Sequence, residues 1–201
     1  MPPELGIIEE FRGAHAEPLT RVAADLRHLV ADVSGGQPEV GQRLKRMATI
    51  LDKLDRQPTM ALSRMNDIAG CRAVVVTQVT VDTLIDRLRA ENPWELLPKT
   101  WDYAATPKPD GYRAKHLVAV ADGLRVEIQL RTAGQHAWAE LVESIDRELG
   151  SRAKFGGATP ELASALADAA ETVARYERRE VDLAAMITAL ALVQLQARWP
   201  R

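Results

Sequence analysis

The sequence is poor in cysteine and in long apolar runs. Its one cysteine, Cys71, can form no disulfide within the chain and cannot build a cysteine-based zinc site. Its apolar neighbours predict a small buried hydrophobic residue. No stretch approaches the roughly 18 consecutive apolar residues that cross a membrane. The first residues include acids and lack the basic start of a signal peptide. We therefore expect a cytoplasmic protein with no membrane segment.

Aromatic residues and net charge are also scarce. Aromatic residues make up 4% of the 201 residues, and the formal net charge is −2. A chain so close to neutral has no global attraction for nucleic acid or anionic membranes, so any binding of phosphate must come from a local basic cluster. The hydrophobic share of 46% and the charged share of 27% are ordinary for a soluble globular protein.

The first third of the chain is predicted to be helical. Apolar residues recur at helical spacing over residues 18–33, and the turn residues 34–38 end this helix. A second helix is predicted over residues 39–56, before Gln57 and Pro58.

The middle third is predicted to contain most of the strands. A short β-branched run predicts a buried strand over residues 71–77, a helix follows over 81–90, and residues 94–103 read as extended. Residues 116–121 and 124–131 predict a hairpin, because Asp122-Gly123 is a typical two-residue hairpin turn.

The last third is predicted to be helical again. One helix covers residues 132–149, Gly156-Gly157 marks a loop, and a long helix runs from 160 to 197. That helix either packs on its own domain or forms a dimer. The order of elements predicts an α+β fold, or α/β with a mixed sheet. We expect a domain over residues 1–150 and a C-terminal helical extension over 151–201.

Two acidic residues stand out. Alternation along the strand 124–131 places Arg125, Glu127, Gln129 and Arg131 on the face opposite its apolar residues. Asp67 directly precedes the predicted strand 71–77, where a carboxylate can hold Mg²⁺ against phosphate oxygens. Carboxylates that converge from two strands can hold the ion and activate a hydroxyl group. The alternatives are an exposed polar face for the strand and a capping role for Asp67.

Two segments carry basic residues that could bind phosphate. On the predicted helix 43–56, one face collects cations opposite an apolar stripe, which is either a solvated surface or a clamp for a triphosphate. The basic and polar residues of this face are Lys45, Arg46, Thr49, Lys53 and Arg56.

The other basic segment is the loop 102–116, which is rich in proline and glycine. It places Tyr112 beside Gly111 and among cations, which suits stacking on a base while Lys108, Arg113, Lys115 or His116 bind phosphates. A mobile surface loop is the alternative.

Taken together, these segments resemble the synthetase domain of the RelA/SpoT family. Five motifs occur in the family's order between Arg43 and Glu143. They are Arg43-x-Lys45-x-x-x-Thr49-Ile50-x-x-Lys53; Asp67-Ile-Ala-Gly-Cys-Arg72; Asp102-Tyr103-x-x-x-Pro107-Lys108-x-x-Gly111-Tyr112-Arg113-x-x-His116; Glu127-Ile-Gln-Leu-Arg131-Thr132; and His136-Ala-Trp-Ala-Glu140.

The resemblance implies a nucleotidyltransferase-like fold, with a mixed sheet of about five strands flanked by helices. It implies a reaction in which ATP donates its β,γ-pyrophosphate to a ribose 3′-hydroxyl and leaves as AMP, with Mg²⁺ as cofactor. In-line transfer at phosphorus depends mainly on positioning and charge stabilisation, which two acids, a metal and a basic clamp can supply.

The resemblance also implies a role for each matching residue. Asp67 holds the metal, and Glu127 binds the metal or takes the hydroxyl proton. The residues expected to bind ATP are Arg43, Lys45, Lys53 and Arg72. Tyr112 stacks on the acceptor base, and the other residues expected around the acceptor are Lys108, His116, Gln129 and Arg131.

The sequence departs from the family pattern at the acceptor side. Trp101 stands where the family usually has a lysine, and Lys99 lies two positions earlier. Residues 150–201 carry no motif that indicates a role, and the chain resembles a small member that has only the synthetase region.

Two acceptors and one further function class stay open. The first acceptor is GDP or GTP, which would give an alarmone. The second is the 3′-terminal adenosine of tRNA, as in toxin-type relatives, which Trp101 and the ending His136-Ala-Trp-Ala…Glu143 resemble; this alternative implies an antitoxin partner. The third hypothesis is an inactive binding module.

Overall fold

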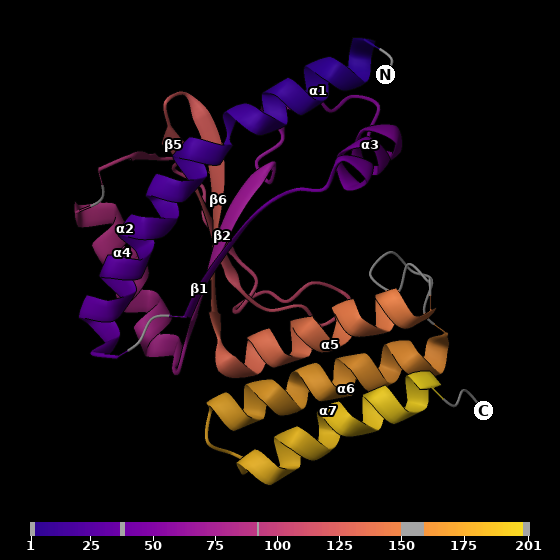
Figure 1. Ribbon diagram of the computed structural model, residues 1–201. Coiled ribbons are helices and arrows are strands. Elements are labelled where there is room, and N and C mark those ends of the chain that lie inside the picture. Colours follow the sequence, from indigo (N-terminus) through magenta and orange to yellow (C-terminus); the bar gives the residue numbers. More distant parts are fainter. Residues whose placement is uncertain (1–2, 37–38, 92, 150–158, 199–201) are drawn as a thin grey trace. The chain divides into compact units, whose positions relative to one another are not determined.

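The computed structural model describes residues 3–36, 39–91, 93–149 and 159–198 (Figure 1). Helices and strands alternate in the middle of the chain, and helices occupy both ends. In chain order the elements are α1 (Pro3–Ala14), α2 (Ala16–Ser34), β1 (Glu39–Leu44), α3 (Met47–Arg56), a short 3-10 helix (Leu62–Arg64), β2 (Ala69–Val75), α4 (Gln78–Glu91), β3 (Glu95–Leu96), β4 (Trp101–Asp102), β5 (Lys115–Ala121), β6 (Leu124–Thr132), α5 (Ala133–Leu149), α6 (Pro160–Glu177) and α7 (Leu183–Arg198).

The strands form one six-stranded sheet. Its order is β1-β2-β6-β5-β3, and β4 pairs with β5 beside this path. The pairs β1–β2, β3–β5 and β5–β6 are antiparallel. The predicted class, α+β with helices around a central sheet, is confirmed. About five strands were expected and the sheet has six, of which β3 and β4 are only two residues long.

The chain divides into two compact units. The first contains residues 1–75, 79–101 and 115–130, and the second contains residues 76–78, 102–114 and 131–201. The second unit joins residues on both sides of position 150. The division into a synthetase domain and a helical extension at that position stays a prediction.

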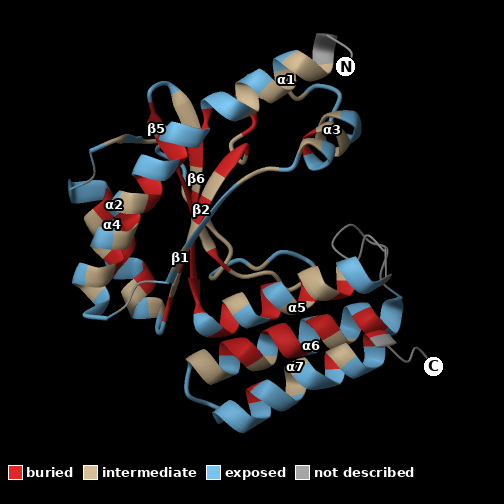
Figure 2. Ribbon diagram, in the orientation of Figure 1, coloured by how far each residue is buried: buried red, intermediate tan, exposed pale blue. Residues whose placement is uncertain are grey.

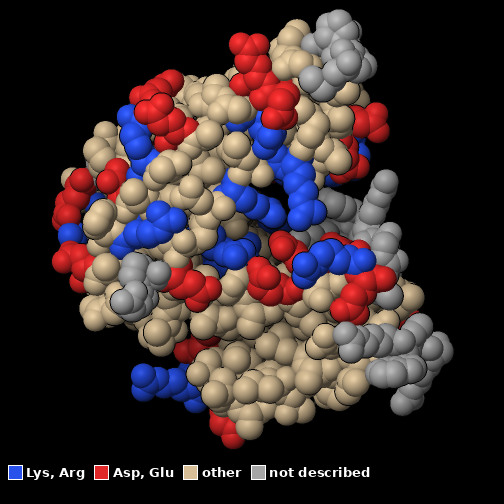
Figure 3. All heavy atoms as spheres, in the orientation of Figure 1, with Lys and Arg blue, Asp and Glu red and all other residues tan. Residues whose placement is uncertain are grey.

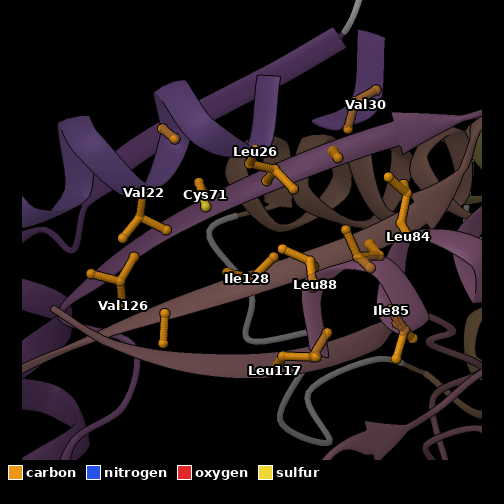
Figure 4. Packing of buried hydrophobic residues seen from close by; sticks show 14 of the residues in the cluster. Val22, Leu26, Val30, Cys71, Leu84, Ile85, Leu88, Leu117, Val126 and Ile128 are labelled. Carbon is orange, nitrogen blue, oxygen red and sulfur yellow. The ribbon is translucent and has the colours of Figure 1, made fainter. Parts of the chain in front are cut away.

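The core of the first unit lies between one face of the sheet and the helices α2 and α4 (Figure 4). Helix α2 contributes Val22, Leu26 and Val30, each at most 1% exposed. Cys71 of β2 lies in this cluster, as expected for a small buried residue, and burial raises the pKa of its thiol to about 12. The thiol is therefore un-ionised and unreactive at neutral pH.

Alternation along each strand gives the sheet two chemically different faces. On β6, Val126, Ile128 and Leu130 are fully buried in the core. On β5, Leu117 and Ala119 point into the same core. Because side chains alternate, the residues between them project from the opposite face of the sheet. That opposite face carries the polar residues of the candidate site.

The predicted hairpin is confirmed. Strands β5 and β6 pair from Ala121 with Leu124 to Lys115 with Leu130. The two turn residues, Asp122 and Gly123, have φ angles of 54° and 75°. Positive φ at both central positions is what a type I′ turn requires, and its twist matches that of the two strands.

The predicted helix over residues 39–56 is wrong in its first half. Residues 39–44 form strand β1, and the helix begins only at Met47. Val40 and Leu44 pack against the core, and a separation of four residues fits one helix face as well as one strand face. Gly41 disfavours a helix, and pairing with β2 decides the conformation.

The second unit is built from the helices α5, α6 and α7 around their own apolar cluster. Trp138 and Val142 of α5 pack with Leu166 and Val173 of α6 in this cluster. Figure 2 shows the buried residues of α6 along one side of the helix, with exposed residues along the other. Helix α6 packs against both α5 and α7, and α5 also contacts α7.

The predicted long helix over residues 160–197 is also wrong, because it breaks into α6 and α7. Arg179 adopts a φ of 62°, and the N–H of Glu180 donates to the carbonyl of Arg175, which closes the end of α6. The break lets α7 fold back on α6 and bury Met186 and Val193. The predicted loop at Gly156-Gly157 lies outside the described residues.

The outer side of α7 is apolar and exposed. Its large hydrophobic residues that are at least half exposed are Leu183, Ile187, Leu192 and Leu195. Formation of a homo-oligomer through the C-terminal helices stays a prediction. Among the described residues, no helix combines the length and the apolar character that crossing a membrane requires.

Candidate functional site

The polar face of the first unit's sheet brings together residues that lie far apart in the sequence. Arg43 on β1 pairs with Gly70 on β2, and His116 on β5 pairs with Gln129 on β6. A Cβ atom at Gly70 would lie 3.9 Å from the Cβ of Glu127. Gly70 therefore lies beside Glu127 and is paired with Arg43, and it adds no side chain of its own to this face.

Asp67 lies between two lysines. Its Oδ2 accepts a hydrogen bond from Lys45 at 2.9 Å, and its Oδ1 accepts one from Lys53 at 2.7 Å. Burial raises the pKa of Asp67, but the hydrogen bonds and charges of Lys53 and Lys45 outweigh burial and lower the pKa overall. Asp67 is therefore an ionised carboxylate at neutral pH. A simple capping role does not account for these two ion pairs.

Glu127 is held by two neighbours on the same face. The Nδ1 atom of His116 lies 3.0 Å from Oε1 of Glu127, and Nε2 of Gln129 donates to Oε2 at 2.6 Å. Burial raises the pKa of Glu127, but the hydrogen bond and charge of His116 and the hydrogen bond of Gln129 lower it overall. The carboxylate is thus ionised, and its orientation is set from both sides.

The charges of Asp67 and Glu127 interact. The negative charge of Asp67 acts on Glu127 in the direction that raises its pKa. Ionised carboxylates are the oxygen ligands that a divalent cation takes in proteins. Within the described ranges, no three His, Cys, Asp or Glu side chains form a metal cluster. Mg²⁺ suits such a pair, since it is usually held by one or two carboxylates and completed by water and substrate phosphates.

The cations around Asp67 come from strand β1, helix α3 and the connection between them. Arg43 lies on β1, Lys45 follows the end of that strand, and Lys53 lies on α3. The N–H of Lys45 donates to the carbonyl of Ile68 at 2.7 Å, which fixes the backbone beside Asp67. Figure 3 shows Lys and Arg side chains gathered along the connection between β1 and α3. The basic face of one helix, as predicted, is therefore wrong; the cluster itself forms through the tertiary structure.

Arg72 adds a further cation on the same sheet face. It pairs in register with Gly41 on β1, and a Cβ atom at Gly41 would lie 3.9 Å from Nη2 of Arg72. The guanidinium group of Arg72 therefore extends over Gly41 of the neighbouring strand.

The second unit carries a separate cluster in the loop 102–114. The Nζ atom of Lys108 lies 4.6 Å from the ring centre of Tyr103 and 4.7 Å from that of Tyr112. Arg131 donates to the hydroxyl of Tyr112 at 2.8 Å, and its guanidinium carbon lies 5.1 Å from the centre of that ring. An aromatic ring with two cations beside it can bind a nucleotide, with the ring stacked on the base and the cations at the phosphates.

Several residues of the sequence-based site have contacts that its motifs did not indicate. His116 and Gln129 bind Glu127 in this structure. Arg113 forms an ion pair with Glu171 at 3.1 Å, and Lys115 forms one with Asp82 at 2.8 Å. Tyr103, whose ring lies beside Lys108, was not among the predicted site residues, although it belongs to the Asp102-Tyr103 motif.

Comparison with known proteins places this arrangement in a family. The sequence profile described as the region found in RelA / SpoT proteins matches residues 42–146. An uncharacterised protein of Mycobacterium tuberculosis is 31% identical over 147 residues, which cover 72% of this chain and 54% of that protein. The GTP pyrophosphokinase YjbM of Bacillus subtilis is 30% identical over 129 residues, which cover 59% of this chain and 58% of that protein.

A solved structure shares the fold. The small alarmone synthetase 1 of Bacillus subtilis, bound to its product pppGpp, superposes with a TM-score of 0.68 at 22% identity, over 86% of this chain and 95% of that one. The chain spans about half the length of the curated relatives it matches. The matched region contains both acids, the surrounding cations and the loop, and on this ground the chain belongs to the RelA/SpoT family.

Proposed function

We propose that this chain is an ATP-dependent pyrophosphotransferase that acts on the 3′-hydroxyl of GDP or GTP. The observation that carries the proposal is the pair of ionised acids, Asp67 held between two lysines in the turn before β2 and Glu127 held by two neighbours on the polar face of the same unit's sheet. The relatives named as GTP pyrophosphokinases support this choice of reaction.

ATP is proposed to bind at the cations of the first unit. The triphosphate meets Lys45 and Lys53, which neutralise Asp67 in the free protein, and Arg43 and Arg72 supply further positive charge. A nucleotide phosphate competes for the same ammonium groups as the Asp67 carboxylate. Bound Mg²⁺, held by Asp67 and Glu127, would offset charge on the phosphate oxygens.

The reaction forms a bond between the acceptor's 3′-oxygen and the β-phosphorus of ATP. The bond between the β-phosphorus and the oxygen bridging to the α-phosphorus breaks, and AMP leaves with that oxygen. The hydroxyl proton passes to the Glu127 carboxylate and then to solvent. Glu127 is suited to this role because it is ionised and is oriented by His116 and Gln129.

The acceptor is proposed to bind at the loop of the second unit. Tyr112 stacks on the base, and Lys108 and Arg131, which flank its ring, bind the phosphates. We assign His116 and Gln129 to the positioning of Glu127, because both side chains contact that carboxylate.

The test is an acceptor assay with ATP labelled in its β- and γ-phosphates. The protein is incubated with Mg²⁺ and, separately, with GDP, GTP and deacylated tRNA. Label in GDP or GTP, together with AMP release, supports the proposal. Label in tRNA alone would assign the chain to the toxin-type activity and point to an antitoxin partner. Binding of ATP with no transfer to any acceptor would favour an inactive binding module.

A further inference from the structure

The loop 102–114 of the second unit, called the acceptor loop below after its proposed ligand, lies against helix α6. No sequence motif marks this helix. Gly111 has a φ of 88°, and a Cβ atom there would lie 2.7 Å from the Cβ of Ala170 and 3.4 Å from Cζ2 of Trp138. Trp138 in turn donates from Nε1 to the carbonyl of Leu166 at 3.0 Å. Backbone of the loop therefore touches α6 directly, at a place where only glycine fits.

One ion pair adds a charged contact to this packing. Nη2 of Arg113 lies 3.1 Å from Oε2 of Glu171 on α6, while Nη1 donates to the carbonyl of Ala104 at 3.2 Å. The Arg113 side chain is only 17% exposed. A single guanidinium group thus connects the beginning of the loop, its end and the middle of α6.

Glu171 is itself held from the other side. Its Oε1 accepts a hydrogen bond from Nη2 of Arg178 at 3.0 Å, and Nε of Arg178 donates to Oε1 of Glu180 at 2.7 Å. Arg178 and Glu180 lie in the turn between α6 and α7. The chain of contacts therefore runs from the acceptor loop through Glu171 to the turn that starts the last helix.

We propose that Glu171 is a positioning residue for the acceptor. By fixing Arg113, it holds the loop in the conformation that presents Lys108 and Tyr112. The link to acceptor binding rests on the proposed function, whereas the link between α6 and the loop does not. The inference gives the C-terminal helices a role in the site, although they lie outside the matched region 42–146.

The test compares Glu171→Gln with Glu161→Gln, an exposed glutamate on the same helix. Amide hydrogen exchange of residues 103–114 is measured in the full chain, and the KM values of acceptor and ATP are measured for each variant. Glu171→Gln is expected to speed exchange in the loop and to raise the acceptor KM roughly 3- to 10-fold, with the KM of ATP unchanged. Glu161→Gln is expected to change neither.

A charge reversal provides the rescue. Arg113→Glu and Glu171→Arg are each expected to loosen the loop. The double variant re-forms the ion pair between positions 113 and 171 but loses the hydrogen bonds to Ala104 and from Arg178, so it is expected to recover slow exchange and a low acceptor KM only in part, and more than either single variant. Unchanged exchange in Glu171→Gln would overturn the link between α6 and the loop. Faster exchange with an unchanged acceptor KM, or an equal rise for both substrates, would overturn the positioning role. A wild-type protein that transfers to no acceptor would overturn the proposed function, and exchange would still decide the structural link.

Discussion

The ammonium group of Lys53 lies 2.7 Å from Oδ1 of Asp67, although the two residues are 14 positions apart, with Lys53 on α3 and Asp67 in the turn before β2. Lys45 reaches the other oxygen of the same carboxylate. In the free protein the acid thus neutralises two cations that the proposed function assigns to ATP. Both lysines are therefore already in place for a phosphate group. The free energy that these ion pairs contribute to the fold depends on the ionisation of Asp67.

Asp67→Asn tests this dependence through the pH profile of stability. The folded-state pKa of Asp67 lies below its ordinary value of 3.8, so its stabilisation is complete above about pH 4 and is lost as pH falls through the folded pKa. The variant is expected to be about 1–3 kcal/mol less stable than wild type at pH 7. Urea unfolding between pH 7 and pH 3 should show this difference shrinking on acidification.

The matched control is Asp55→Asn, an exposed acid on α3. It is expected to change the free energy of unfolding little at any of these pH values. A difference between wild type and Asp67→Asn that stays constant down to pH 3 would contradict the ion pairs as its source.

Glu127→Gln separates chemistry from binding. The variant keeps the size of the side chain but removes the group proposed to take the proton, so transfer is expected to fall by at least about 100-fold. ATP affinity, measured by calorimetry without acceptor, is expected to change far less, because the lysines stay in place. Turnover equal to wild type would remove Glu127 from the mechanism.

His116→Asn tests whether His116 acts through Glu127. Burial raises the pKa of Glu127 and His116 lowers it, so loss of the histidine is expected to raise that pKa. Because the ionised carboxylate is the active form, the acid limb of the profile of kcat/KM against pH should move to higher pH. His28→Asn, on exposed His28 of α2, should leave the profile in place. A uniform loss of activity with an unmoved acid limb would instead indicate direct contact of His116 with substrate.

Tyr112 offers a pair of variants that separates stacking from hydrogen bonding. Tyr112→Ala is expected to weaken acceptor binding by about 1–3 kcal/mol and to spare ATP. Tyr112→Phe keeps the ring but loses the hydroxyl that accepts from Arg131, so it should retain most acceptor affinity. Acceptor and ATP dissociation constants measure both effects. Equal weakening of the two ligands by Tyr112→Ala would argue against stacking on the acceptor.

Local patterns determined much of the fold from the sequence alone. The turn Asp122-Gly123 and the alternation on each side of it were sufficient for the hairpin, since both signals lie within a few neighbouring residues. The same alternation placed Glu127 and Gln129 opposite the core of the first unit. The five ordered motifs were sufficient for the family, because their order and spacing are properties of the chain itself.

The tertiary structure decided where local signals were ambiguous. The four-residue spacing of Val40 and Leu44 fits a helix and a strand equally, and only pairing with β2 made residues 39–44 a strand. The apolar spacing over residues 160–197 predicts one helix, interrupted only around Glu180, but a turn with Arg179 at positive φ ends α6 there and lets α7 pack back on α6. Contacts between distant residues, such as Lys53 with Asp67 and Arg113 with Glu171, follow from how elements pack, and no periodicity in the chain encodes them.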